Sequence, residues 1–114
     1  MVALSAGLSP QDNCSVSVTL SPSSVSPHSP VTATIAVSCQ SSKPAGTIVL
    51  NMALHGSGVP GISLCVNDVR SENNTSSVSC TFRAPLGVGQ YDIIARYIGA
   101  RGYTVTGSSV LTVA

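Results

Sequence analysis

Apolar and polar side chains alternate along most of this chain, and turn residues separate the alternating runs. In the run CSVSVTL, residues 14–20, apolar side chains share one face and hydroxyl side chains occupy the other. A period of two places successive side chains on opposite faces of a β-strand, so each run predicts a strand with one buried face. Glu, Lys and Gln, which favour helices, are scarce, whereas β-branched residues dominate. The chain is therefore expected to be all-β.

Seven alternating runs are expected to form strands: 14–20, 31–39, 47–54, 62–66, 77–83, 90–98 and 103–114. Seven short strands in about 100 residues predict a two-sheet antiparallel sandwich. The run 47–54 is apolar on both faces, which is typical of a central strand, and Leu54 belongs to its expected inward set. The Pro- and Ser-rich segment 21–30 is expected to hold no regular structure, and Gly107 to mark a bulge or kink.

The composition bounds the domain organisation and the partners. A length of 114 residues fits a single domain, which we place at 12–114, after an extended N-terminal segment at 1–11. Charged residues make up only 8% and the net charge is +1, so no nucleic-acid partner is expected. No run of 18 apolar residues occurs, so no membrane span is expected.

The N-terminal segment contains a second, shorter alternation, VALSAGL, with Val2, Leu4 and Leu8 as its large apolar residues. Such a segment could pair as an extra strand with a sheet edge, either of its own domain or of a neighbour. The plainer interpretation is a frayed terminus. The segment lacks a basic region and is too short for a full secretory signal, so export is expected to rely on a signal removed beforehand or on another route.

The four cysteines admit three interpretations: a metal site, a redox pair or disulfide staples. Zinc sites and redox pairs usually present closely spaced cysteines such as CxxC, and here the cysteines are far apart. All four occupy alternating strand positions, and the midpoints of 14–39 and of 65–80 both fall in turn-prone sequence. We therefore expect two hairpin-stapling disulfides, Cys14–Cys39 and Cys65–Cys80. The alternatives are a Cys39–Cys80 link across the sandwich and four reduced thiols.

Disulfides indicate an oxidising compartment, or a hyperthermophile whose cytosol tolerates them. The expected location is therefore extracellular or at the cell surface, with a virion as the alternative. Asn13, Asn73 and Asn74 each begin an N-x-[ST] triplet and are candidate glycan acceptors. Asn73 and Asn74 fall at the expected hairpin tip, where a glycan would be accessible.

The stretch LGVGQYDIIARYIG, 86–99, resembles the immunoglobulin-like β-sandwich repeats of prokaryotic surface and extracellular proteins. Leu86, Gly89 and Tyr91 match their pattern, and the resemblance extends roughly over 14–113. It implies an immunoglobulin-like sandwich in which Tyr91 is a tyrosine-corner residue whose hydroxyl bonds back to the preceding turn. Antibody-type domains have a cysteine two residues after that tyrosine, where this chain has Ile93, and a core tryptophan, which it lacks.

No catalytic constellation is visible. His28 and His55 lie in turn-like sequence and are expected to be exposed, and the four acidic residues are scattered. Arg83 and Arg96 are expected on outer faces, where they could pair with Asp92 or with a partner. We therefore expect no enzymatic activity, no cofactor and no metal.

The sequence favours a structural or protein-interaction domain of an extracellular or surface assembly. Such an assembly could be a filament, a coat or an adhesin, and its subunits could associate through the N-terminal segment. A virion decoration or capsid module is one alternative. A carbohydrate-binding module is another, although the lack of Trp and the single Phe count against it.

Overall fold

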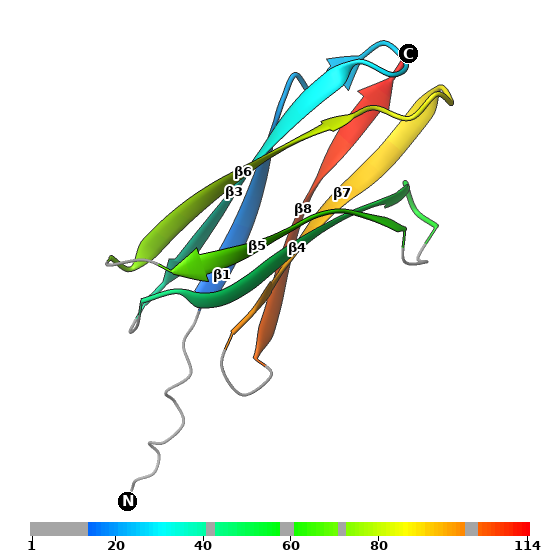
Figure 1. The fold of residues 1–114 in the computed structure, drawn as a ribbon. Coiled ribbons are helices and arrows are strands. Elements are labelled where there is room, and N and C mark those ends of the chain that lie inside the picture. The colour runs from blue at the N-terminus through cyan, green and yellow to red at the C-terminus, as the bar shows by residue number, and fades with distance from the viewer. Residues whose placement is uncertain (1–13, 41–42, 58–60, 71–72, 100–102) are drawn as a thin grey trace, which may run out of the picture.

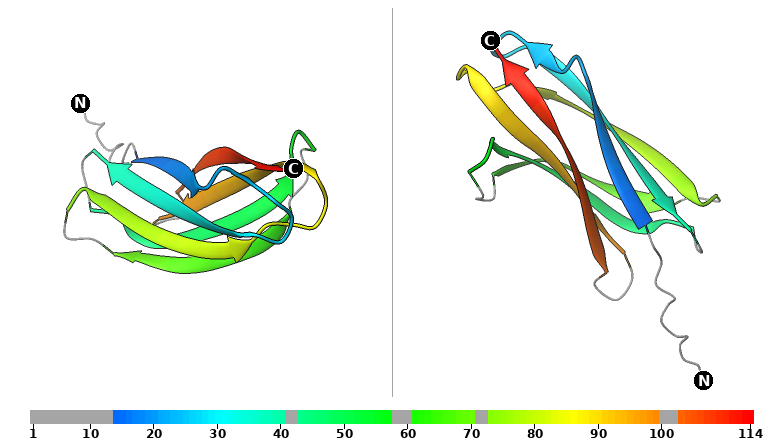
Figure 2. Two further views of the ribbon diagram at one scale, coloured as in Figure 1. Left: turned by 90° about the horizontal axis from the view of Figure 1, so that it is seen from above. Right: turned by 180° about the vertical axis from the view of Figure 1, so that it is seen from behind.

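The structure, a computed structural model, describes residues 14–40, 43–57, 61–70, 73–99 and 103–114. Two sheets are stacked in layers (Figure 1; Figure 2, left), with strand orders β1-β3-β6 and β2-β8-β7-β4-β5. The expected all-β, two-sheet sandwich is therefore confirmed. The eight strands are β1 (Cys14–Ser21), β2 (Ser24–Val25), β3 (Pro30–Cys39), β4 (Ala45–Leu54), β5 (Ile62–Arg70), β6 (Thr75–Arg83), β7 (Gly89–Ile98) and β8 (Thr104–Val113).

The alternating runs became strands because one face of each is buried between the sheets. In β3, every second residue from Val31 to Cys39 is at most 3% exposed. β4 lies between β7 and β5, as expected for a run that is apolar on both faces. The inward set of β4 was predicted one residue too long, because Leu54 is 59% exposed and lies beyond the last β4–β5 pair, Met52 with Ile62.

The segment 21–30 is more regular than expected. Ser24 and Val25 form β2, which pairs in parallel with Thr112 and Val113 of β8. The chain thus leaves the three-stranded sheet after β1, joins the five-stranded sheet at β2 and returns at β3. The partner of β2 lies almost 90 residues away, so the local Pro and Ser pattern could indicate turns but not this pairing.

The prediction that residues 62–83 form a hairpin is wrong. β5 and β6 follow each other in the sequence but lie in different sheets, β5 beside β4 and β6 beside β3. The eight β4–β5 pairs and the nine β3–β6 pairs leave each strand at the edge of its own sheet. The connection therefore crosses from one layer to the other.

Gly107 does not mark a bulge. Its pairing with Ala95 is part of a continuous register between β7 and β8, and the one irregularity of β4–β5 pairing lies between Leu50 and Asn51. A Cβ at Gly107 would overlap the carbonyl oxygen of Val16 in β1. The glycine is needed because β1 and β8, from different sheets, approach here backbone to backbone.

The strands define two ends of the molecule. At the Cys14 end lie the starts of β1 and β6 and the end of β3, because Cys14 pairs with Cys39 and Ser38 with Thr75. At the opposite end, which we call the Leu86 end, lie the end of β6, the start of β7 and the end of β8. Figure 1 shows the C-terminus at the Leu86 end.

Replacing Gly107 by alanine should lower the free energy of unfolding by about 1 to 3 kcal/mol, because the new methyl group forces the backbones of β1 and β8 apart. Urea unfolding of the variant and the parent measures the difference. The matched control is Ser108→Ala at the exposed neighbouring position, which should change the value by less than about 0.5 kcal/mol. Equal effects of the two substitutions would show that the close approach at Gly107 has no energetic role.

Candidate functional site

The first disulfide, Cys14–Cys39, lies within the three-stranded sheet. The two residues are direct register partners in β1 and β3, with their Cα atoms 3.9 Å apart. Cys39 is buried, and its N–H donates a hydrogen bond to the carbonyl of Asn74 at 2.8 Å. The predicted pairing is confirmed, and the bond fastens the first residue of β1 to the last residue of the central strand.

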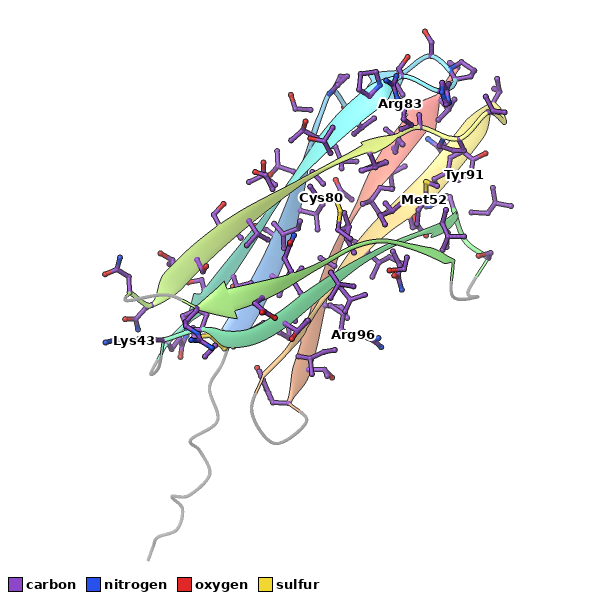
Figure 3. All side chains as sticks on the ribbon, in the orientation of Figure 1. Lys43, Met52, Cys80, Arg83, Tyr91 and Arg96 are labelled. Atoms are coloured by element: carbon purple, nitrogen blue, oxygen red, sulfur yellow. A yellow bond between two sulfur atoms is a disulfide. The ribbon has the colours of Figure 1, made fainter. Side chains whose placement is uncertain are left out.

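The second disulfide, Cys65–Cys80, joins the two sheets. Cys65 is in the edge strand β5 and Cys80 in the edge strand β6, and their Cα atoms are 6.5 Å apart. In Figure 3 the sulfur beside the Cys80 label lies between the ribbons of these strands. The pairing is the predicted one, but it bridges two layers where a hairpin staple was expected. All four cysteines of the chain are therefore disulfide-bonded.

The side chain of Asn74, predicted only as a candidate glycan acceptor, forms hydrogen bonds within the domain. Its Nδ2 donates hydrogen bonds to the carbonyl oxygens of Cys39 at 3.1 Å and Gln40 at 3.2 Å. An N-linked glycan would be attached to this same nitrogen and would remove one of its two donors. Asn73, beside it, is exposed and keeps its status as a candidate acceptor. Asn13 lies outside the described residues.

Tyr91 bonds back to the preceding turn, as the resemblance implied. Its hydroxyl donates to the carbonyl oxygen of Gly87 at 2.9 Å. Gly89, between them, has φ of +152°, a conformation that side chains other than glycine rarely adopt. The Leu-Gly-x-Gly-x-Tyr pattern therefore holds the turn from β6 to β7 by one hydrogen bond and one glycine-specific conformation.

His55 and Asp92 form an ion pair that the sequence did not reveal. The imidazole Nδ1 of His55 donates to Oδ1 of Asp92 at 2.7 Å, and the Gly56 N–H donates to Oδ2 at 3.4 Å. The hydrogen bond from His55 lowers the pKa of the Asp92 carboxyl. Partial burial opposes this shift, and the Gly56 amide and the charge on His55 add to it. The two residues are 37 positions apart, so only the β4–β7 pairing brings them together.

Asp92 therefore pairs with His55 and not with Arg83 or Arg96, which the sequence offered as its partners. Arg83 is exposed, and its guanidinium donates to the carbonyl oxygen of His28 at 3.3 Å. Arg96 is exposed and lies on the same strand as Asp92, two outward positions further along. His28 is exposed, as expected, and has φ of 64°. His55 is 52% exposed in its side chain, yet it is bound to Asp92.

The outer faces of the two sheets differ in chemistry. Most outward residues of the three-stranded sheet carry hydroxyl groups, with Pro30, Ala36 and Arg83 as the exceptions, and we call this surface the hydroxyl face. The five-stranded sheet instead shows aliphatic residues between polar ones, including Val66, which is 62% exposed. The hydroxyl face consists of Ser15, Ser17, Thr19, Ser21, Thr32, Thr34, Ser38, Thr75, Ser77, Ser79 and Thr81, in register across β1, β3 and β6.

Large aliphatic side chains gather in solvent at the Leu86 end. Leu54, Ile62, Leu86 and Val88 are 59%, 60%, 74% and 72% exposed. Register places Leu54 opposite Tyr91, whose hydroxyl holds the turn that carries Leu86 and Val88. Ile62 lies opposite Met52, two residues before Leu54 on β4. Figure 3 shows Met52 and Tyr91 at this end of the molecule. Sequence reasoning missed this cluster because it assigned Leu54 to the core.

The described residues contain no cluster of metal-ligating side chains, because no three His, Cys, Asp or Glu among them lie together. No helix suited to crossing a membrane occurs in the described ranges. The N-terminal residues Val2, Leu4 and Leu8 fall outside these ranges. What the arrangement offers is two chemically distinct outer faces and one exposed aliphatic end, which are surfaces for binding other molecules.

Several solved structures share this architecture. The CARDB domain of the PF1109 protein from Pyrococcus furiosus, crystallised in complex with di-metal ions, has a TM-score of 0.61 and 11% sequence identity, and the match covers 90% of this chain and 93% of that one. Spo0M, a sporulation control protein from Bacillus subtilis, has a TM-score of 0.58 and 13% identity, and the match covers 88% of this chain and 49% of that one. The likeness shows a shared immunoglobulin-like fold.

Comparison of the sequence alone finds no relative. No family model matches the chain. No curated protein matches it either.

Removing either disulfide should destabilise the domain. In the chain-entropy model, bonds that close separations of 25 and 15 residues are each worth about 3 to 3.5 kcal/mol, so Cys14→Ala/Cys39→Ala and Cys65→Ala/Cys80→Ala should each lose roughly that much. Urea unfolding measures the loss. Reduction of the unaltered chain is the control, because it breaks the bonds and keeps the sulfur atoms. Losses below about 1 kcal/mol would contradict the prediction.

The pair of His55 and Asp92 should stabilise the fold in a pH-dependent way. The pKa of Asp92 is lower in the folded chain, so the contribution is complete above the unfolded value of about 3.9 and is lost as the pH falls through the folded value. The difference in unfolding free energy between the unaltered chain and Asp92→Asn should therefore shrink between pH 5 and pH 2. His55→Gln should remove the same contribution. A difference that is constant with pH would contradict the assignment.

Proposed function

We propose that this chain is a non-catalytic structural domain of an extracellular or surface assembly, and that its copies associate through residues 1–11. The observation that carries the proposal is the cluster of four aliphatic side chains, each more than half exposed, at the Leu86 end. Exposed aliphatic groups gathered in one place on a domain this small mark an interaction surface. The edge strands β5 and β6 border the same region and offer unpaired backbone groups on their outer sides.

The disulfides support the location. Two disulfides in a chain of 114 residues indicate an oxidising environment, and small secreted domains commonly rely on such bonds. An extracellular filament, coat or adhesin is consistent with this chemistry. A virion is also consistent with it, and electron microscopy separates the two, because a capsid or decoration module would form closed shells.

The metal complex of the Pyrococcus domain is not part of this proposal. That domain was crystallised with di-metal ions. In the part of this chain that the structure describes, no group of His, Cys, Asp or Glu side chains is placed to hold a metal. The two chains share only 11% of their residues, so the likeness shows the fold alone.

The hydroxyl face favours a second candidate, a carbohydrate-binding module. Hydroxyl side chains both donate and accept hydrogen bonds, as sugar hydroxyls do. On this surface they lie in register, and Thr32 and Thr81 are hydrogen-bonded to each other at 3.1 Å. Binding to insoluble polysaccharides that is lost in Thr34→Val/Ser79→Ala would support this candidate. If the polysaccharides bind the altered and unaltered chains equally well, the hydroxyl face is not a carbohydrate-binding surface.

Assembly through the N-terminal segment should disappear when its aliphatic residues are replaced. Purified full-length chain should form filaments or oligomers that grow with concentration, seen by electron microscopy and by light scattering. The variant Val2→Ser/Leu4→Ser/Leu8→Ser should remain monomeric, because the large apolar side chains that drive strand pairing are gone. The matched control, Ala3→Ser/Gly7→Ser, alters small residues on the other face of the same segment and should assemble. Assembly by all three chains would refute the role of residues 1–11.

A further inference from the structure

We infer that the exposed aliphatic cluster at the Leu86 end receives residues 2–8 of a second copy of this chain. The inference rests on the proposed function and deepens it, because it names the surface that the N-terminal segment binds. The surface is defined by Leu54, Ile62, Leu86 and Val88. Three features carry the argument: the form of this surface, the pattern of the segment and the reach of the chain.

The surface offers both side chains and backbone. β5 begins at Ile62 and β6 ends at Arg83, and each is an edge strand of its sheet. The two strands are tied together by Cys65–Cys80, three positions in from each of these strand ends. A strand placed beside these ends pairs its backbone with an open edge and covers the aliphatic side chains with its own.

The segment has the pattern that such a surface requires. Val2, Leu4, Ala6 and Leu8 fall on one face of an extended strand, and Ala3, Ser5 and Gly7 fall on the other. The apolar face would contact the aliphatic cluster, and the face of small residues would point to solvent. Residues 1–11 contain no charged side chain, so the segment buries no charge when it binds.

The charged side chains Asp92 and Arg83 near the Leu86 end each have a hydrogen-bond partner within the domain. The Asp92 carboxylate accepts from His55 and Gly56, and the Arg83 guanidinium donates to the carbonyl of His28. The surface therefore offers aliphatic side chains and backbone edges to a ligand that carries no charge. Residues 2–8 are such a ligand, because they are apolar or small and uncharged.

The reach of the chain selects a second copy over the same copy. The segment is attached at Cys14, at the end opposite the aliphatic cluster. A ten-residue strand such as β3 is about 33 Å long, and an extended chain spans at most about 3.6 Å per residue. A segment that ran back from Cys14 over that length would use about nine residues, so only residues 2–5 could arrive at its own Leu86 end, and the whole of residues 2–8 can lie there only in a neighbouring copy.

Donor and acceptor at opposite ends give the assembly a direction. The contact joins two different surfaces of the same chain, so each bound copy still offers one free segment and one free end. Such a head-to-tail contact builds open chains unless the rotation between copies happens to close a ring. The inference therefore predicts filaments with a single repeating contact.

Paired variants test the acceptor surface in the full-length chain. Ile62→Asp/Leu86→Asp places charges at positions that are 60% and 74% exposed, so the fold should tolerate them. The concentration needed for assembly should rise at least tenfold. The matched control is Val66→Asp, which is 62% exposed on the same strand β5 but lies on the outer face of the sheet, and it should assemble as the unaltered chain does. Thermal unfolding of both variants verifies that they are folded.

A photo-crosslinker identifies the occupant directly. The chain with p-benzoylphenylalanine in place of Leu86 is mixed with isotopically labelled chain and irradiated. Crosslinks from position 86 should reach residues 2–8 of the other copy, and a crosslinker in place of Val66 should not reach them.

The outcomes separate the two proposals. Assembly that is lost in Val2→Ser/Leu4→Ser/Leu8→Ser but kept in Ile62→Asp/Leu86→Asp leaves the proposed function standing and overturns the acceptor surface. Crosslinks from position 86 to any region other than 2–8 also overturn it. A wild-type chain that stays monomeric at all concentrations, or that assembles equally well with the three serine substitutions, overturns the proposed function itself.

Discussion

The structure depends on a layer of aliphatic side chains that neither sheet could bury alone. Val, Ile, Leu and Ala side chains from seven strands meet between the sheets, and no polar or charged residue is buried among the described ones. Because this layer is built from small and medium side chains, the two sheets can approach closely. Burial of one face of every strand also fixes the register, since a shift by one residue would turn the hydroxyl groups inward.

The close approach of the sheets creates a problem at their margins, and the chain solves it differently on each side. On one side, β1 and β8 meet backbone to backbone, which only Gly107 permits. On the other side, a covalent bond between Cys65 and Cys80 joins the edge strands. At the two ends, tyrosine hydroxyls hold the backbone: Tyr91 binds Gly87, Tyr97 binds both backbone groups of Ala45, and Tyr103 accepts from the N–H of Cys14.

Sequence patterns predicted what depends on neighbouring residues. The alternation from Val31 to Cys39 indicated a strand and its buried face. Both cysteine pairs were predicted correctly, but Cys65–Cys80 was predicted from a hairpin that the structure does not have. Features that depend on distant partners were out of reach. The two-residue strand β2 exists because of β8, the position of β6 depends on β3, and the pair of His55 and Asp92 requires the β4–β7 register. The aliphatic end was missed because a period of two says which face turns inward, but it does not say where the pairing of β4 with β5 stops.

The bond between Cys14 and Cys39 determines how the domain responds to mechanical load. A pull on the chain ahead of Cys14 enters β1 through its backbone and β3 through the disulfide at the same moment. β1 therefore cannot be unzipped from its first residue, one hydrogen bond at a time. The C-terminus lies at the opposite end, beside the start of β7, so tension between the two termini runs along the strands. The hydrogen bonds between strands are then loaded together in shear, which is the geometry in which a sandwich domain resists extension best.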